Sequence, residues 1–350
     1  MLSAQNIPEY SVEATYFRGA FLRHSTEIAH LIDQTPQGAL LKFNKQTTGQ
    51  RDWQISQNYP AMGFSVLYQN TGNAALGNHI AVYAHYQWFF VHRMLSFTLG
   101  QGIGWATNPY DSHTNYLNTA YGSHLLSATY LQLSLRKERL IGDWGMHFDL
   151  GLYHFSNGSL RTPNTSTNTI AASAGINYSI GQAEDFNTEF GREDSLVRKN
   201  RVQTIVRSGL HEIDVIGMGL TPFLHLGAGY ERQYARHASW EVGTDLFLTF
   251  ALRKWIEHKA VSIPEGEYTG QEDFKRIGVY VGHNYSLHKN AMHLQFGYYL
   301  YNPVDRNQLF YQRIGLSRAI DPKGDWRLGV GLKTHAAKAE AVEFSIQKKW

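Results

Sequence analysis

Residues 326–333 read WRLGVGLK, and every even position in this stretch is apolar. Trp326, Leu328, Val330 and Leu332 alternate with an arginine, two glycines and a lysine. Successive side chains of a β-strand point to opposite faces of the sheet. The stretch therefore predicts a strand with one apolar face and one small or polar face.

The same alternation recurs along the chain. It is clear at 240–252 and 342–350, and similar at 80–90, 95–105, 144–152, 170–180 and 292–300. These segments run to roughly 10–14 residues, near the ~9–11 that a tilted strand needs to cross a bilayer and longer than the ~5–6 of soluble sheets. Their polar faces are rich in Gly, Ser, Asn, Gln and Tyr, as in a barrel lumen, and aromatic residues gather at segment ends as in an interfacial girdle.

These features predict an all-β protein, a transmembrane antiparallel up-and-down β-barrel. The chain ends on Trp350, an aromatic terminus that resembles those of outer-membrane barrels. About 16 candidate strands can be marked, and because the first three are weakly patterned the expected number is about 12–16. The stretches 181–200 and 257–273 look like irregular connections rather than domain boundaries, so residues 1–350 are expected to form one barrel domain. A soluble β-sandwich would show the same alternation and is the alternative fold.

Composition excludes several other classes of protein. The 350 residues are 43% hydrophobic and 17% charged, which rules out a disordered chain. The absence of cysteine rules out disulfide scaffolds, thiolate metal sites and cysteine nucleophiles. A net charge of +3 gives no support for a nucleic-acid partner. The 17 histidines show no metal-ligand spacing, so neither a metal nor a cofactor is predicted. The first residues lack a signal peptide, which predicts a mature or trimmed chain.

One segment departs from the alternation in a way that suggests chemistry. Residues 154–164 read HFSNGSLRTPN and follow directly from the segment 144–152, whose even positions are apolar. His154 and Ser156 continue that even parity, so a regular strand would point both toward lipid. Two residues along a strand span ~7 Å, near enough for an imidazole base and a hydroxyl nucleophile to interact.

The next segment can supply a third partner. Asn168 has the parity of the apolar positions that begin at Ile170, so a hairpin would bring it to the same outer surface as His154 and Ser156. Its amide could orient the imidazole, and Asn164 could donate to an oxyanion. The ordinary interpretation is that His-x-Ser ends a strand and that Asn-Gly and Pro-Asn are loop residues.

The run His154-Phe155-Ser156-Asn157-Gly158, with Pro163-Asn164, resembles the signature of the lipid A 3-O-deacylase (PagL) family, also called acyloxyacyl hydrolases. The resemblance covers residues 144–180 and implies an outer-membrane β-barrel serine esterase. It implies that His154 is the base, that Ser156 is the nucleophile and that Asn164 contributes to the oxyanion hole, with Asn157 and Gly158 beside it. The third member in the best-known branch is Glu, whereas this chain has Asn168.

The predicted function is therefore an outer-membrane esterase that removes an ester-linked acyl chain from lipid A, with lipopolysaccharide and outer-membrane lipids as its partners. The alternatives are a non-enzymatic channel or porin-like barrel and a phospholipid esterase. If Trp350 is periplasmic, alternation of strand directions places His154 and Ser156 at the extracellular end. That end is level with the outer leaflet, which holds lipid A.

Overall fold

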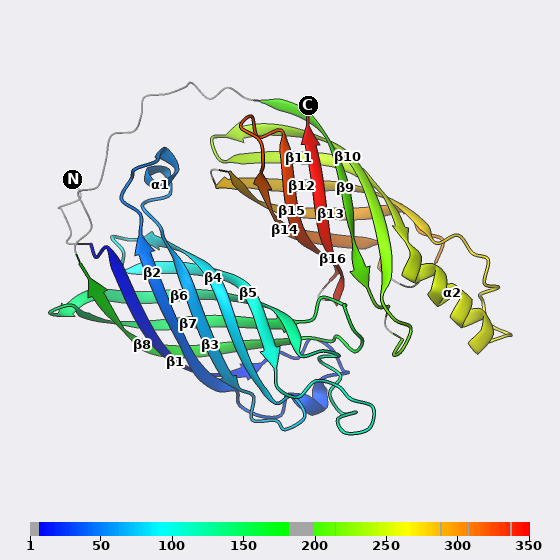
Figure 1. The fold of residues 1–350 in the computed structure, drawn as a ribbon, viewed down its shortest axis with the longest axis horizontal. Coiled ribbons are helices and arrows are strands. Elements are labelled where there is room, and N and C mark those ends of the chain that lie inside the picture. The colour runs from blue at the N-terminus through cyan, green and yellow to red at the C-terminus, as the bar shows by residue number, and fades with distance from the viewer. Residues whose placement is uncertain are drawn as a thin grey trace. The chain divides into compact units, whose positions relative to one another are not determined.

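The computed structural model describes residues 7–181, 199–213, 215–287, 289–304, 306, 308–336 and 338–350. These residues form sixteen antiparallel strands that close into two barrels of eight (Figure 1). Within each barrel every strand pairs with its neighbours in chain order. The all-β, up-and-down barrel fold expected from the alternation is confirmed, and the strand total is at the upper end of the expected range.

The first barrel closes where β1 pairs with β8, in a register that runs from Tyr10 opposite Ile180 to Phe21 opposite Thr169. A short helix, α1 (Asp52–Ser56), lies between its second and third strands. Its strands are β1 (Tyr10–Phe21), β2 (Gln37–Gln46), β3 (Ala61–Asn70), β4 (Asn78–Phe90), β5 (Leu95–Ala106), β6 (Leu125–Ile141), β7 (Trp144–Ser156) and β8 (Thr167–Ile180).

The second barrel closes where β16 pairs with β9, in a register that runs from Phe344 opposite Ser208 to Lys349 opposite Gln203. Its strands are β9 (Asn200–His211), β10 (Thr221–Ala235), β11 (Ala238–Thr249), β12 (Lys275–Leu287), β13 (Asn290–Tyr301), β14 (Phe310–Ala319), β15 (Trp326–His335) and β16 (Lys338–Lys349).

The structure contains two closed barrels, whereas the alternation predicted one barrel over residues 1–350. Period-two patterning reports which face of a strand is apolar, and that face is the same in one large barrel or two small ones. Closure is decided by which distant strands pair. Accordingly, the chain divides into a unit of Met1–Asn157 and Thr165–Glu193 and a unit of Gly158–Asn164 and Asp194–Trp350.

The connection expected at 257–273 differs as well. Strand β11 ends at Thr249 and is followed by helix α2 (Phe250–Ser262), which buries Ala251, Leu252, Trp255 and Ile256. Leu252 of α2 has the same even parity as the apolar positions of β11. The period-two pattern therefore continues to residue 252 in the sequence, and it does not reveal that the helix begins at Phe250. Among the described residues no helix is long and apolar enough to cross a membrane. Most of the stretch 181–200 lies outside the described residues.

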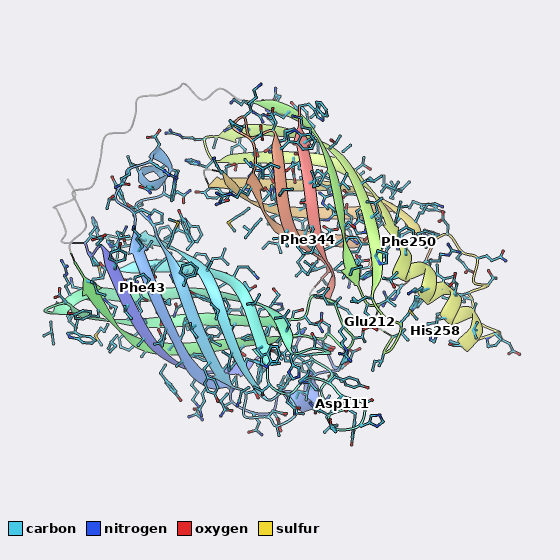
Figure 2. The ribbon with its side chains drawn as sticks, in the orientation of Figure 1. Phe43, Asp111, Glu212, Phe250, His258 and Phe344 are labelled. Carbon is cyan, nitrogen blue, oxygen red and sulfur yellow. The ribbon has the colours of Figure 1, made fainter. Side chains whose placement is uncertain are left out.

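Both barrels have apolar exteriors and polar or aromatic interiors. Phe43 of the first barrel and Phe344 of the second are exposed on the outside (Figure 2). By contrast, Lys42, next to Phe43 along β2, is fully buried in its barrel. An apolar outer face with a polar lumen is the pattern of a transmembrane barrel.

Candidate active site

His154 and Ser156 lie at the end of β7, on the parity that faces outward. Trp144, Phe148 and Leu150, which share this parity, are exposed, and His154 is half-buried. Ser156 keeps the parity but is only 2% exposed, so the expectation that its hydroxyl faces lipid is wrong. The alternation of buried and exposed residues stops at the end of β7, where residues 155–159 are all buried.

Asn168 lies directly opposite His154 in the β7–β8 register, as a hairpin between these segments predicts. The Nδ1 atom of His154 is 2.7 Å from Oδ1 of Asn168. An amide oxygen only accepts, so Nδ1 carries the proton and Nε2 keeps a lone pair. A neutral imidazole with a free Nε2 lone pair, oriented by a polar side chain, is the arrangement a general base requires.

His24 also reaches this cluster and was missed at the sequence level. Its Nδ1 atom lies 3.3 Å from Nδ2 of Asn168, and its Nε2 atom lies 2.8 Å from the Thr165 carbonyl. The contact exists because β1 pairs with β8, and the backbone N–H of Leu22 still donates to the Asn168 carbonyl beyond the last strand pair. With 144 positions between the two residues, only an expectation that β1 and β8 pair could have revealed it.

The remaining candidates fall in different units. Asn157 is buried in the first unit, whereas Gly158 and Asn164 belong to the second. Within that second unit, the hydroxyl of Ser159 donates to the Ala339 carbonyl at 2.8 Å, and the carboxylate of Glu212 accepts from the Thr162 amide at 2.7 Å. The side-chain amide of Asn164, which is buried, lies 3.4 Å from the Ser159 hydroxyl.

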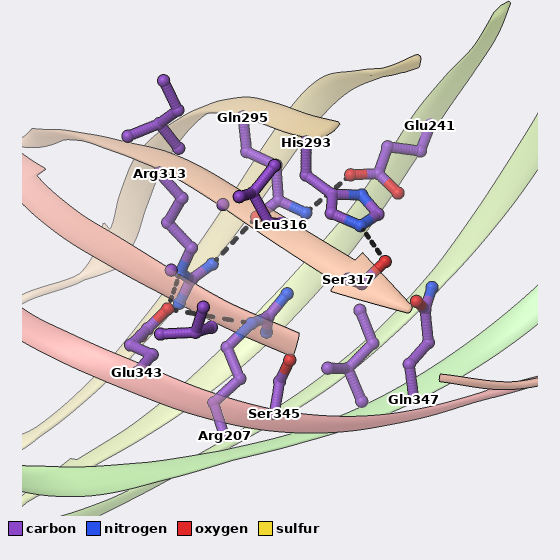
Figure 3. A pocket seen from close by; sticks show the side chains of 15 residues that line it. Arg207, Glu241, His293, Gln295, Arg313, Leu316, Ser317, Glu343, Ser345 and Gln347 are labelled. Atoms are coloured by element: carbon purple, nitrogen blue, oxygen red, sulfur yellow. Dashed lines mark hydrogen bonds and ion pairs between the residues drawn. The ribbon is translucent and has the colours of Figure 1, made fainter. Parts of the chain in front are cut away.

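A second histidine–serine pair lies inside the second barrel, in the pocket of Figure 3. His293 Nε2 is 2.5 Å from Ser317 Oγ, and its Nδ1 is 2.6 Å from Asn284 Oδ1. The Asn284 amide donates in turn to the Glu241 carboxylate at 3.1 Å. Arg327 also donates to the Ser317 hydroxyl, at 2.9 Å.

The first barrel contains the same set of residue types in its lumen. Ser65 Oγ is 2.6 Å from Nδ1 of His85, whose Nε2 is 2.7 Å from Asn44 Oδ1, and the Asn44 amide donates to Glu13 at 3.0 Å. These four side chains are buried. A Ser–His–Asn–Glu chain that recurs in both interiors is best explained as a way to satisfy buried polar groups.

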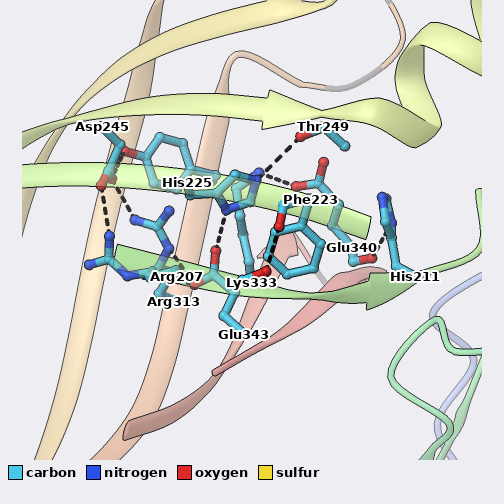
Figure 4. Close-up of polar contacts among 12 residues, drawn as sticks. Arg207, His211, Phe223, His225, Asp245, Thr249, Arg313, Lys333, Glu340 and Glu343 are labelled. Atoms are coloured by element: carbon cyan, nitrogen blue, oxygen red, sulfur yellow. Dashed lines mark hydrogen bonds and ion pairs between the residues drawn. The ribbon is translucent and has the colours of Figure 1, made fainter. Parts of the chain in front are cut away.

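Charged side chains cross the rest of the second lumen (Figure 4). Asp245 is paired with Arg207 at 2.8 Å and with Arg313 at 2.5 Å. Glu343 is ion-paired with Arg313 at 2.8 Å and lies 2.7 Å from Nδ1 of His225. Eight strands enclose an interior only wide enough for side chains, and these pairs occupy it.

Two family models match the sequence of the chain. Residues 37–177 match the family model described as lipid A 3-O-deacylase (PagL), and residues 200–347 match the one described as acyloxyacyl hydrolase, C-terminal domain. Together the two matches span most of the chain. The chain belongs to the PagL family. Both descriptions name ester hydrolases, so this PagL-family protein is an ester hydrolase.

Solved structures that match the chain do so at low sequence identity and low TM-score. The outer membrane enzyme PagL is 14% identical, with a TM-score of 0.30, and the match covers 47% of this chain and 97% of that one. A mutant of the Rhodopseudomonas blastica porin is 9% identical, with a TM-score of 0.21, and the match covers 97% of this chain and 99% of that one. No curated protein sequence matched the chain.

Proposed function

We propose that the first barrel removes an ester-linked acyl chain from lipid A, with Ser156 as nucleophile, His154 as general base and Asn168 as the residue that orients the imidazole. The observation that carries this proposal is the 2.7 Å contact between His154 Nδ1 and Asn168 Oδ1, on the outward parity at the end of β7. Family membership supplies the substrate class, and the geometry supplies the protonation state that a base needs.

The reaction is an acyl transfer in two steps. Ser156 Oγ attacks the ester carbonyl while His154 Nε2 takes the hydroxyl proton, and His154 then returns that proton to the departing alcohol of lipid A. Water hydrolyses the acyl-serine in the reverse sense and releases the fatty acid. The amide of Asn157, which lies in the same unit as Ser156, is the proposed donor to the oxyanion.

Position on the barrel suits a substrate that stays in the bilayer. His154 and Ser156 lie at the opposite end of β7 from Trp144, which pairs with Tyr178 near the end of β8. If the end of β8 faces the periplasm, the pair lies at the outer leaflet of a bacterial outer membrane. Because Ser156 is buried, the proposal requires the segment after β7 to open for the ester.

A channel is the weaker alternative. The first lumen is filled by a cluster of rings that includes Phe17, Tyr83, Tyr130 and Tyr153, and the second by ion pairs. Neither arrangement leaves the open lumen that a porin needs. A phospholipid esterase would use the same residues, so that alternative is decided by the substrate.

Mass spectrometry of lipid A after incubation with the protein tests the proposal. We expect the wild-type protein to remove the mass of one acyl chain and Ser156→Ala to remove none. Ser173→Ala is the matched control, because Ser173 lies on β8 and donates to Asp149 in the lumen. Parallel incubation with glycerophospholipid vesicles identifies a phospholipid esterase. Deacylation by Ser156→Ala at the wild-type rate would rule out the assigned nucleophile.

A further inference from the structure

We infer that His24 is a positioning residue, which holds the Asn168 amide in the one orientation that lets His154 act as a base. The inference rests on the proposed function. It assigns a role to a residue on the connection between β1 and β2, outside the motif that identifies the family. The four groups involved, on His24, His154, Thr165 and Asn168, all lie in the first unit.

An asparagine raises an orientation problem that a glutamate does not. Both oxygens of a carboxylate accept hydrogen bonds, whereas an amide has one accepting and one donating end of nearly equal shape. With Oδ1 toward His154, the proton lies on Nδ1. Nε2 then has the lone pair that the proposed mechanism needs to take the Ser156 proton. With the amide reversed, Nδ1 would have to accept, the proton would move to Nε2, and the ring could no longer take the serine proton.

His24 supplies the partner that selects the productive orientation. Its Nε2 atom is 2.8 Å from the Thr165 carbonyl, which only accepts, so Nε2 carries the ring proton. In the neutral ring Nδ1 then has only a lone pair, and it accepts from Asn168 Nδ2 at 3.3 Å. The Leu22 carbonyl, 3.2 Å from Nδ1, is another acceptor and cannot bond to an unprotonated Nδ1.

The three bonds therefore run in one direction. His154 Nδ1 donates to Asn168 Oδ1, Asn168 Nδ2 donates to His24 Nδ1, and His24 Nε2 donates to the carbonyl of Thr165. Carbonyls lie beside both ring nitrogens of His24, and the Thr165 contact at 2.8 Å is shorter than the Leu22 contact at 3.2 Å. The Thr165 carbonyl therefore selects this direction for the whole chain. The barrel provides the position of His24, because Leu22 continues the β1–β8 ladder opposite Asn168.

Three single variants test the role in the natural background. Loss of one hydrogen bond predicts that His24→Ala lowers kcat about three- to tenfold with little change in KM. His24→Asn keeps an acceptor near the Nδ1 position and is expected to recover most of the rate. His30→Ala is the matched control, because His30 lies on the same connection and bonds the Leu117 carbonyl at 2.7 Å without reaching Asn168. Equal losses in His24→Ala and His24→Asn overturn the inference.

Double variants separate orientation of the amide from general support of the loop. In an Asn168→Glu or Asn168→Ala background no amide remains to be oriented, so His24→Ala is expected to cause no further loss. The same fold-loss in all three backgrounds overturns the inference. Failure of the proposed function gives a different result, because Ser156→Ala would then remain active whatever His24 does. Heat-dependent gel mobility checks that each variant still forms its barrels.

Discussion

The two barrels share an architecture and an apolar exterior but fill their interiors differently. The first lumen has the larger cluster of rings, with Phe17 and Tyr153 stacked at 4.6 Å and Tyr83 edge-on to Tyr130 at 4.9 Å. Beside these rings, Glu13 is ion-paired with Lys42 and Arg136. The second lumen has a smaller cluster of rings and more buried ion pairs, with Asp245 between two arginines. An outer face that suits lipid therefore places little constraint on how an eight-stranded barrel fills its core.

The two barrels also differ in the side chains that surround an outward-facing histidine. On the first barrel, His154 has an amide partner opposite it and a serine two residues along β7. On the second barrel, His283 bonds the Tyr234 hydroxyl at 2.7 Å and lies edge-on to Trp240. The His283 cluster has the composition of an aromatic girdle at a membrane interface. The comparison supports the proposed site on the first barrel.

The largest difference in activity is expected between two histidine substitutions, one at the proposed site on the first barrel and one in the lumenal His293–Ser317 pair of the second. We expect His154→Ala to lower deacylation by about 10³–10⁴-fold, the usual effect of losing a general base. His293→Ala, which disrupts the lumenal pair of the second barrel, should leave deacylation within about twofold. Rates on purified lipid A measure both. A large loss from His293→Ala alone, in a folded protein, would contradict the assignment of chemistry to the first barrel.

The charged interior should make the second barrel vulnerable to loss of Asp245. Asp245→Ala leaves two arginines, Arg207 and Arg313, beside one carboxylate, Glu343. The excess buried positive charge costs about 3–5 kcal/mol. We expect urea unfolding in detergent to show this loss for the second barrel while the first barrel is unchanged. Glu265→Ala, in the exposed turn after α2, is the control, with an expected change within about 0.5 kcal/mol.

Substitutions of Asn168 test the effect of an asparagine at the position where the best-known branch of the family has a glutamate. Asn168→Ala removes the partner of His154 Nδ1 and is expected to lower turnover by about tenfold or more. Asn168→Glu restores a carboxylate, which also stabilises the imidazolium, and is expected to retain or raise turnover. Turnover as a function of lipid A concentration measures both. Indifference to both substitutions would mean that Asn168 does not orient the base.

The smallest expected effect concerns the girdle of the second barrel. Tyr234→Phe removes the hydroxyl that bonds His283, and loss of one exposed hydrogen bond costs about 1 kcal/mol or less. Deacylation should be unaffected, because this cluster lies on the other barrel. A measurable loss of activity would show that the second barrel's outer surface also binds substrate.

Local patterning was sufficient for much of this protein. Alternation predicted the antiparallel barrel fold and the outward parity of His154, Ser156 and Asn168. These features depend on the period of a strand and on pairing between sequence neighbours, both of which are local. The family motif added the reaction class, because its residues are contiguous.

Only the tertiary structure decided which distant strands meet. Closure of β1 on β8 and of β9 on β16 divides sixteen similar strands into two barrels, and it brings His24 to Asn168. It also decides that Ser156 is buried despite its outward parity. Sequence alternation carries no information on these points, since every strand presents the same apolar face to lipid. Long-range pairing is selected by the fit of side chains inside each lumen, which depends on the whole set of strands at once.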